Sequence, residues 1–387
     1  MCPITVLPRM GRDVTFGGDP TDMMNIAVAC GGTGGHIFPG LATGRILQVR
    51  GHTVTLWLAG RDVEACSVAD WQGATVHIRA SGFPSGLSLR GLASIWRMAG
   101  AVVVAWRRLR ETRPDVLLCM GSYASVGPCL AARLLGIPVV LHEANAVPGR
   151  AISFLARFAS RVAVGYEAAL AWFPPSVNVV VTGFPLRKGF VARPKPPADE
   201  SASALTLLIM GGSQGAHALN SRMPAVAAAL QAKLDRPLRI IHLAGRQEAE
   251  AVAADYRAQQ VEAEVHAFCA DMASLYARAD VAVARAGAAS CTELAVCGVP
   301  AVLVPLPHAP RNHQMRNAEA MAESGGMLVL PESEFSLKNM TQRLYMLFRN
   351  QDGLQLMRKA LLTSMPADGA ERLATLVETV AGGKSSV

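Results

Sequence analysis

The residues that point most directly to chemistry form two glycine turns, each after an apolar run. "GGTGGH" spans 31–36 and "GGSQGA" spans 211–216. A glycine turn between a strand and a helix lets backbone N–H groups approach a phosphate, and the helix N-terminus adds the positive end of its dipole. Each turn therefore predicts contact with a phosphorylated ligand, although tight turns also use glycine for structural reasons alone.

Neither turn matches two familiar phosphate-binding sequences. No Lys follows either turn, so neither is a P-loop. A dinucleotide fingerprint that begins at Gly32 needs glycine at position 37, where the sequence has Ile37. His36 closes the first turn, and a histidine titrates in the range suited to a general base. The alternative for His36 is a residue that only contacts phosphate or orders the turn.

A third candidate site spans 285–318. A predicted strand ends at Arg285, and small residues follow that would let a diphosphate approach: Gly287, Ala288 and Ala289. Ser290 lies at the start of the next helix. Glu293, in the first turns of that helix, is placed to accept hydrogen bonds from both hydroxyls of a ribose. Its alternative role is to offset the helix dipole.

The segment 307–318 is polar in a chain that is mostly apolar, which suits recognition of sugar hydroxyls. It contains His308, Arg311, Asn312, His313, Gln314 and Asn317. No Asp-x-Asp occurs in the chain, so the sequence does not indicate a carboxylate pair holding a metal under a diphosphate.

Alternating apolar strands and helical stretches must position these residues. Strands are expected at 25–30, 52–60, 115–121, 137–143, 161–166, 177–183, 205–210, 239–245, 261–268, 280–284 and 300–307. Helices are expected between them, for example at 128–136 and 149–159. This alternation predicts an α/β protein with parallel sheets covered on both faces.

The pattern restarts after a segment rich in Pro, Ser and charge, which predicts two doubly wound domains in tandem. We expect a loose extension at 1–23, a first domain at 24–187, a linker at 188–203 and a second domain at 204–365. The last helical stretch, 366–381, is expected to cross back onto the first domain.

Excess positive charge belongs to the first half of the chain. Residues 24–187 hold 15 Arg and no Lys against 7 Asp and Glu, whereas the whole chain carries a net charge of +8. This favours an anionic partner for that half. With 5% aromatic residues and no nucleic-acid motif, nucleic acid is not the expected partner.

A lipid surface fits the stretch 83–113, where apolar residues lie among arginines. The expected membrane face comprises Phe83, Leu87, Leu92 and Trp96. Residues 98–106 fit a core helix with arginine ends, and nine apolar residues are too few to span a bilayer. The cysteines lie mostly in apolar runs and lack zinc spacing, so we interpret them as reduced core residues of a cytosolic protein.

Five blocks occur in an order that resembles a known family. They are "GGTGGH" at 31–36, "HEANAVPG" at 142–149, "GGSQGA" at 211–216, "RAGAASCTE" at 285–293 and "HQMRNA" at 313–318. Together they resemble the MurG family of bacterial N-acetylglucosaminyltransferases from about Met24 to about Ala381. The resemblance implies a GT-B fold, in which two Rossmann-like domains face a cleft that holds the active site.

The resemblance also implies a reaction and a location. GlcNAc passes from UDP-GlcNAc to the C4 hydroxyl of MurNAc in lipid I, with inversion and without a cofactor or metal, and lipid II for peptidoglycan is formed. The enzyme is expected to lie peripherally on the cytoplasmic face of the inner membrane. Its implied partners are UDP-GlcNAc, lipid I, the anionic membrane surface, and proteins of cell-wall synthesis and division.

Site residues are carried over position by position. The family's donor contacts imply donor-binding roles for Thr33, Gly34, Gly35, Asn145, Arg187, Ser213, Cys269, Arg285, Ala288, Ala289, Ser290, Glu293 and Gln314. Cys269 matches a position that reads uracil through its backbone. The candidate general base is His36. The expected acceptor contacts are Tyr123, Ser125, His142 and Glu143.

Two blocks depart from the family pattern. "GSYASVGP" at 121–128 has Ser122 and Val126 where the family has glycines, and "GFPLR" at 183–187 has Phe184 where it has asparagine. Three alternatives stay open. His142 and Glu143 form a second candidate base pair, the chain could hydrolyse or epimerise UDP-GlcNAc, or it could bind lipid or nucleotide without catalysis.

Overall fold

The structure, a computed structural model, describes residues 23–32, 34–60, 68–78, 89–190, 204–212 and 215–383. The expected loose extension, except its last residue, and positions 191–203 of the expected linker lie outside the described residues.

Seven parallel strands form the first sheet, in the order β3-β2-β1-β4-β5-β6-β7. Its central strands are buried on both faces, as an unbroken apolar run such as "VLLC" requires. The elements of this part are β1 (Asn25–Ala29), α1 (Gly34–Val49), β2 (Thr53–Leu58), β3 (Thr75–His77), α3 (Leu89–Thr112), β4 (Val116–Cys119), α4 (Val126–Leu134), β5 (Val139–Glu143), α5 (Arg150–Leu155), β6 (Arg161–Val164) and β7 (Val179–Val181), with short 3₁₀ turns η1 (Tyr123–Ser125), η2 (Ala156–Phe158) and η3 (Glu167–Trp172).

Six parallel strands form the second sheet, in the order β10-β9-β8-β11-β12-β13. The elements of this part are β8 (Leu205–Met210), α6 (His217–Asn220), α7 (Met223–Gln231), β9 (Leu238–Leu243), α8 (Ala249–Ala258), β10 (Ala263–His266), α9 (Met272–Arg278), β11 (Val281–Ala284), α10 (Ala288–Val296), β12 (Ala301–Leu303), α11 (His313–Glu323), β13 (Met327–Val329), α12 (Leu337–Arg349) and α13 (Gln351–Ser364), with 3₁₀ turns η4 (Pro310–Asn312) and η5 (Glu332–Glu334). The last helix, α14 (Gly369–Gly382), packs on the first sheet. The predicted α/β class with two doubly wound sheets is confirmed.

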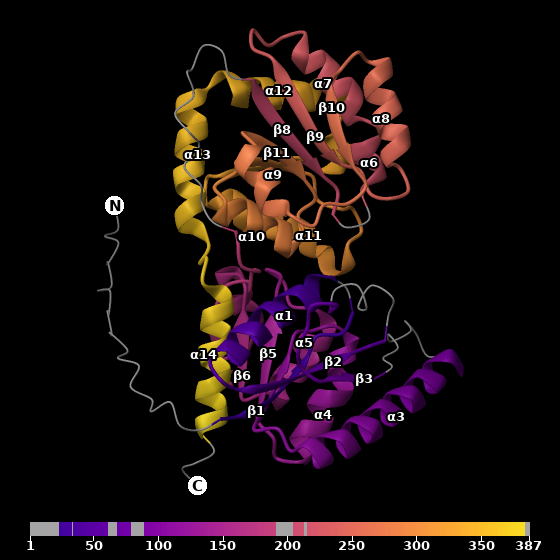
Figure 1. The fold of residues 1–387 in the computed structure, drawn as a ribbon, viewed down its shortest axis with the longest axis vertical. Coiled ribbons are helices and arrows are strands. Elements are labelled where there is room, and N and C mark those ends of the chain that lie inside the picture. Colours follow the sequence, from indigo (N-terminus) through magenta and orange to yellow (C-terminus); the bar gives the residue numbers. More distant parts are fainter. Residues whose placement is uncertain are drawn as a thin grey trace, which may run out of the picture.

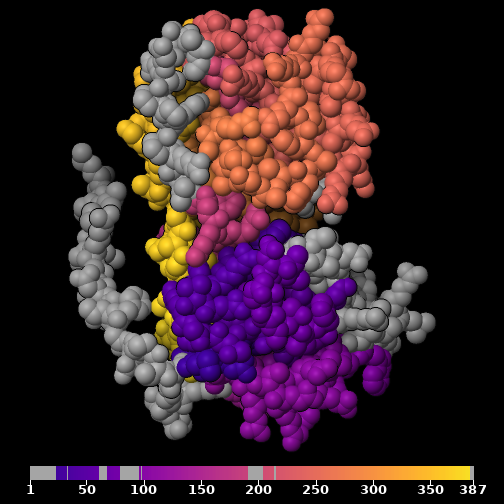
Figure 2. Space-filling model, in the orientation of Figure 1, coloured from indigo at the N-terminus to yellow at the C-terminus, as the bar shows by residue number. Residues whose placement is uncertain are grey.

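The chain forms two stacked lobes (Figure 1). We call the part built on β1–β7 together with α14 the first lobe, and the part built on β8–β13 with α13 the second lobe. Helix α14 lies on the first sheet, where Leu373, Ala374 and Val377 are buried with residues of β1 and α1. The carboxylate of Glu378 pairs with Arg50 at 2.7 Å and with His52 at 3.0 Å. The chain thus returns from the second lobe to the first, along one side of the molecule (Figure 2).

An apolar cluster joins the lobes. Ala144, Tyr166 and Phe184 of the first lobe are buried in the same cluster as residues of α10, β11 and β12. The chain passes between the lobes at two places, near Gly183 and near Pro366, and these two segments touch each other. Gly183 has a φ of +81°, and a Cβ on it would lie 2.3 Å from Cγ of Pro366. Only glycine therefore allows the two crossings to pass this closely.

Candidate functional site

In the first sheet the order of the strands reverses between β1 and β4, which are neighbours in the sheet. We call this place the switch point of the sheet. In open α/β sheets the crevice beyond the carboxyl ends of the strands at such a point is where ligands bind. The first glycine turn follows β1, and the turn at 120–122 follows β4. The first glycine turn and the turn that matches the family's second glycine turn therefore both flank the switch point of this lobe. Thr33 lies outside the described residues.

His36 sits between these two turns. It is half-buried in the first turn of α1, after Gly34 and the exposed Gly35. A Cβ at Gly121 would lie 3.2 Å from Cδ2 of His36, and one at Gly32 would lie 3.6 Å from its Nδ1. The imidazole thus lies at the switch point and stays partly accessible to solvent. A group that exchanges a proton with a ligand needs such access.

Ser122, one of the two departures in this turn, has a conformation that favours glycine. Its φ is +65° and its ψ is 167°, a region in which residues other than glycine are strained. Its hydroxyl donates to the carbonyl of Gly31 at 3.1 Å and accepts from the N–H of Ala124 at 3.1 Å. Ser122 therefore links the two turns by a side-chain hydrogen bond that glycine could not form.

The other acceptor candidates of this turn differ in exposure. Ser125 is buried, and its hydroxyl donates to the carbonyl of Gly121 at 2.6 Å, so it shapes the turn. Tyr123 is 37% exposed, so its ring is open to a ligand.

His142 and Glu143 are buried at the end of β5. His142 is completely buried, and burial lowers its pKa to about 4, so the ring is neutral at physiological pH. Its Nδ1 has no hydrogen-bond partner among the described residues. Glu143 accepts hydrogen bonds from the N–H of Asn145 at 2.9 Å and of Gly149 at 2.8 Å. These contacts shape the loop 144–149, whereas His36 is the more accessible of the two histidines.

The second sheet has its switch point between β8 and β11. The glycine turn after β8 is compact, because a Cβ at Gly215, whose φ is +80°, would lie 2.0 Å from the carbonyl oxygen of Ala244. Ser213 lies outside the described residues. The segment after β11 leads into α10, whose first residues include Ala288, Ala289 and Ser290.

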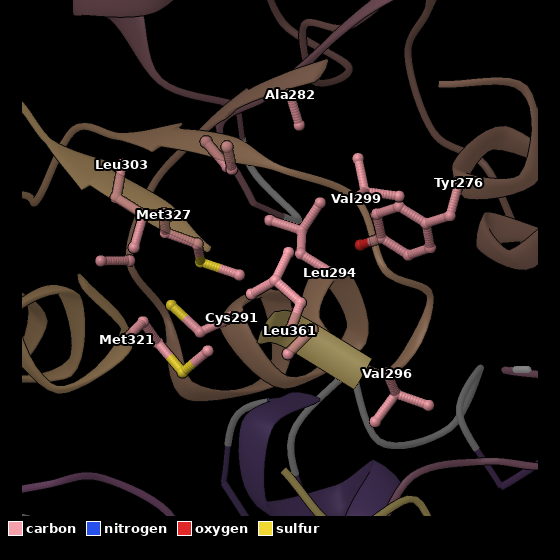
Figure 3. Close-up of a cluster of buried hydrophobic side chains, with 14 of the residues drawn as sticks. Tyr276, Ala282, Cys291, Leu294, Val296, Val299, Leu303, Met321, Met327 and Leu361 are labelled. Carbon is pink, nitrogen blue, oxygen red and sulfur yellow. The ribbon is translucent and has the colours of Figure 1, made fainter. Parts of the chain in front are cut away.

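Helix α10 is fixed in place by its apolar side. Cys291 and Leu294 point into a cluster with Leu303, Met327 and Leu361 (Figure 3). Residues on that side are almost completely inaccessible to solvent. This packing holds the N-terminus of α10 at the switch point, and the N–H groups of a helix N-terminus are suited to binding an anion.

Glu293 lies on α10 with its carboxylate near Tyr276. The Tyr276 hydroxyl donates to Oε2 of Glu293 at 2.8 Å. Burial raises the pKa of Glu293 to about 7, although the hydrogen bond from Tyr276 and the charge of Arg187 oppose that rise. A half-buried carboxylate whose pKa lies near neutrality is typical of a ligand site.

Arg187 lies close to both lobes. Its guanidinium stacks on the ring of Phe38, a residue of α1, with Cζ 4.7 Å from the ring centroid. It is also close enough to Glu293 for the two charges to interact. Arg187 thus joins the start of α1 to the carboxylate of α10.

Arg285 turns its side chain into the second lobe. It pairs with Glu332 at 2.5 Å and donates to the carbonyls of Val304 at 3.1 Å and Pro305 at 3.2 Å. Its side chain therefore holds the segment after β12, and any contact with a ligand would come from its backbone.

That segment is strained and leads into α11. His308, Arg311 and Asn312 all have positive φ, between +54° and +59°. Such conformations concentrate at functional sites. Gln314, in the first turn of α11, accepts from the N–H of Leu306 at 2.9 Å through Oε1, which leaves its amide N–H groups for a ligand. Cys269, half-buried in the loop after β10, packs on the apolar cluster around α10.

Contacts between Asn145 and Asn317 connect the carboxyl ends of the two sheets. The side-chain N–H₂ of Asn317 donates to Oδ1 of Asn145 at 3.1 Å. In the sequence Asn317 stands out only as part of a polar segment, and nothing marks Tyr276. No pattern in the chain connects either residue to its partner, because the contacts bridge long sequence separations.

The expected membrane face is partly described. Phe83 and Leu87 lie outside the described residues, Leu92 lies on α3, and Trp96 of α3 is 75% exposed. Residues 98–106 do not form a fully buried helix as expected. Ala105 is buried, but Val103 and Val104 are 50% and 46% exposed, because α3 covers the first lobe with one face only. Among the described residues, no helix is long and apolar enough to cross a bilayer.

Two family models match the chain. The N-terminal domain model of glycosyltransferase family 28 matches residues 26–164, and the C-terminal domain model of the same family matches residues 206–373.

Relatives of known name align with most of the chain. A protein of Aeromonas hydrophila named UDP-N-acetylglucosamine–N-acetylmuramyl-(pentapeptide) pyrophosphoryl-undecaprenol N-acetylglucosamine transferase is 39% identical over 93% of this chain and 98% of its own length. A protein of Ectopseudomonas mendocina with the same name is 41% identical over 80% of this chain and 85% of its own. The crystal structure of Acinetobacter baumannii MurG has a TM-score of 0.76 and 31% identity over 92% of this chain and 99% of that one.

Proposed function

The chain belongs to the MurG family within glycosyltransferase family 28, and from this premise we propose that it transfers GlcNAc from UDP-GlcNAc to the C4 hydroxyl of MurNAc in lipid I, forming lipid II. The fold is GT-B. The observation that carries the proposal is that a hydrogen bond between Asn145 and Asn317 joins the carboxyl edges of both sheets, and that the charge of Arg187 acts on Glu293 across the same joint. Both sets of glycine turns therefore border one site.

The donor occupies the second lobe in this proposal. The ribose hydroxyls of UDP donate to Glu293, uracil lies against the backbone of Cys269, and the diphosphate faces the turns at 211–216 and 287–290. The first turn, with Gly34 and Gly35, and the guanidinium of Arg187 approach the same diphosphate or sugar from the other side. Asn145 and Gln314 read the hydroxyls of the sugar. Backbone N–H groups and helix N-termini stabilise the negative charge that develops on the departing UDP.

The acceptor occupies the first lobe. Its C4 oxygen attacks C1 of GlcNAc from the face opposite UDP, while His36 takes the hydroxyl proton. The new O–C1 bond forms as the C1–O bond to UDP breaks, so the configuration at C1 inverts. Tyr123 is placed at the turn beside His36 to contact the acceptor. In this proposal the linker at 188–203 divides the chain into an acceptor-binding domain at 24–187 and a donor-binding domain at 204–365.

We propose that transfer needs no metal, because backbone N–H groups and helix N-termini are expected to meet the charge of the diphosphate. Among the described residues, no group of three or more His, Cys, Asp or Glu is placed to hold a metal ion. We therefore expect labelled GlcNAc to pass from UDP-GlcNAc to a lipid I analogue at an unchanged rate in EDTA. The assay measures labelled lipid II with and without added magnesium. Activity that EDTA abolishes and magnesium restores would contradict this assignment, whereas absence of transfer under all conditions would contradict the proposed function itself.

Membrane contact is proposed for α3 on the cytoplasmic face of the inner membrane. Trp96 is exposed on this helix, as are Arg107, Arg108 and Arg110, and an exposed basic and apolar surface suits anionic lipid. Proteins of cell-wall synthesis and division are proposed partners at that surface.

Replacing Leu92 and Trp96 with Ser is expected to weaken binding to anionic vesicles while thermal unfolding stays unchanged. Binding of the unmodified protein should also fall at high salt, because the screening length shortens to about 3 Å at 1 M. Sedimentation with vesicles measures both effects. The matched control is Leu356→Ser, since Leu356 is 67% exposed on α13 of the second lobe. Undiminished binding of the double variant would place the contact on another surface.

A further inference from the structure

We propose that Asn317 is a positioning residue that couples the seating of the two lobes to recognition of the transferred sugar, because it fixes the side-chain amide of Asn145. The inference rests on the proposed function, since it assigns Asn145 to the sugar of the donor. Asn317 itself is completely buried and does not reach the site.

All the hydrogen-bonding groups of the Asn317 side chain are engaged. Its Oδ1 accepts from the N–H of Ala146 at 2.8 Å. Its N–H₂ donates to Oδ1 of Asn145 at 3.1 Å and to the carbonyl of Ala286 at 3.1 Å. Two of these three partners belong to the loop after β5 of the first lobe, and the third belongs to the turn after β11 of the second lobe. One amide therefore spans the joint between the lobes.

These contacts determine which way the amide of Asn145 faces. Its Oδ1 accepts from Asn317, and its Nδ2 donates to Oε1 of Glu143 at 3.0 Å. If the amide of Asn145 turned over, its N–H₂ would face the donor of Asn317 and its oxygen would face a carboxylate. The arrangement therefore permits one orientation. In that orientation the second N–H of the half-buried Asn145 remains for a sugar hydroxyl.

The first lobe alone holds this orientation only through Glu143. Glu143 accepts from the backbone N–H of Asn145 as well as from its side chain, and these contacts stay within one loop. When the lobes separate, Oδ1 of Asn145 loses Asn317, and only the hydrogen bond from Nδ2 of Asn145 to Glu143 still holds the amide. Sugar recognition is then complete only when the lobes are seated together.

Gln314 lies one helical turn before Asn317 on α11, so both residues share a face of that helix. We proposed that Gln314 also reads the sugar. When α11 packs against the loop 144–149, the side-chain amides of Asn145 and Gln314 both lie near the proposed position of the sugar. UDP without the sugar contacts neither of them in this arrangement.

Arg311 offers a matched control, because it makes a separate contact across the same joint. Its guanidinium donates to the carbonyl of Pro148 at 2.8 Å and to the hydroxyl of Ser153 at 2.9 Å. It also stacks on Trp172, with Cζ 5.6 Å from the ring centroid. Arg311→Ala therefore removes one contact between the lobes and leaves every contact of Asn145 and Asn317 in place.

The experiment measures the Kd of UDP-GlcNAc and of UDP by calorimetry for Asn317→Ala, Asn145→Ala, the double variant and Arg311→Ala. We expect Asn317→Ala to weaken UDP-GlcNAc binding about ten-fold more than UDP binding, the effect of one or two lost hydrogen bonds. In the Asn145→Ala background the same change should add less than about two-fold, because the two residues act through one amide. Arg311→Ala should change both ligands by the same factor.

An equal loss for both ligands with Asn317→Ala would overturn the inference, as would a full ten-fold selective loss that persists without Asn145. If Asn317→Ala does not fold, Asn317→Asp serves instead. It keeps the volume and the acceptor for Ala146, but it places an oxygen against the oxygens of Asn145 and Ala286. A selective loss is expected for it as well, and its absence would overturn the inference. Failure of the unmodified protein to bind UDP-GlcNAc would contradict the proposed function and not this inference.

Discussion

Replacing His36 with Ala is expected to lower kcat by about 10²–10⁴, the usual contribution of a general base. The affinity for UDP should stay within a few-fold, because the ring lies at the first switch point and the uridine contacts lie in the second lobe. At saturating donor, the acidic limb of the pH profile of kcat should disappear, provided that chemistry limits turnover. Steady-state kinetics with a lipid I analogue, together with calorimetry for UDP, measures both effects.

His36→Gln is the sharper form of this test. Glutamine keeps a hydrogen-bonding group that could order the turns around Gly32 and Gly121, but it does not accept a proton near neutral pH. His217→Gln is the matched control, because His217 follows the second glycine turn as His36 follows the first. Its side chain is 82% exposed and pairs with Glu248 at 3.1 Å, so kcat should hardly change.

A near-native kcat for His36→Gln would rule out the base role. Attention would then move to His142 and Glu143, although both are buried beneath the loop 144–149. If His36 contacts only phosphate, donor affinity should fall instead, and the pH profile should keep its shape.

The sequence was sufficient to predict the fold where apolar runs end in glycine turns. The strands before 31–36, 211–216 and 285–290 are long apolar runs, and their burial on both faces leaves no other arrangement than a parallel sheet. Strands β3 and β13 were not predicted, because the apolar runs around them, "TVHI" at 75–78 and "MLVL" at 327–330, are too short for periodicity to distinguish a strand from other structure. The exposed side of α3 was missed for a related reason, since "AVVVAW" contains no polar residue to mark it.

The candidate site was less predictable, because its geometry depends on contacts between distant residues. The family motifs named Asn145 and Glu293, but the partners that orient them, Asn317 and Tyr276, follow from the fold alone. Arg285 illustrates the opposite case. Its position beside the small residues of α10 suggested a ligand contact, yet its guanidinium is engaged by Glu332 and two carbonyls. Motif spacing does not specify which way a side chain turns.

Donor binding is expected to depend on Glu293 and on pH. Glu293→Ala should weaken UDP and UDP-GlcNAc alike, because the carboxylate holds the ribose that both ligands share. The loss of a hydrogen bond to a charged group costs about 1.5–3 kcal/mol, which is roughly a 10- to 150-fold rise in Kd. Calorimetry with both ligands measures this effect. An unchanged UDP affinity would contradict the ribose assignment.

The sign of the pH dependence follows from the raised pKa of Glu293, which is about 7 against an ordinary value of 4.5. Below about pH 7 the carboxyl is protonated and has lost one acceptor site, and above it the carboxylate accepts from both ribose hydroxyls. UDP-GlcNAc should therefore bind more tightly as the pH rises from 6 to 8. Stability should change in the opposite direction. Between the two pKa values the native state holds the extra proton, so this contribution to stability is lost as the pH rises through about 7.

Two variants separate these effects from other titrations. Glu293→Gln keeps an acceptor for Tyr276 but has no proton to lose, so both pH trends should flatten. The hydrogen bond from the Tyr276 hydroxyl to Oε2 of Glu293 lowers the pKa of that carboxyl. Tyr276→Phe removes the hydrogen bond, so the pKa of Glu293 and the midpoint of donor binding should both move to higher pH. Calorimetry of UDP-GlcNAc between pH 6 and 8 measures the midpoint for each protein. A slope that survives in Glu293→Gln would assign the titration to another group, and a midpoint that Tyr276→Phe leaves in place would show that this hydrogen bond does not control the carboxylate.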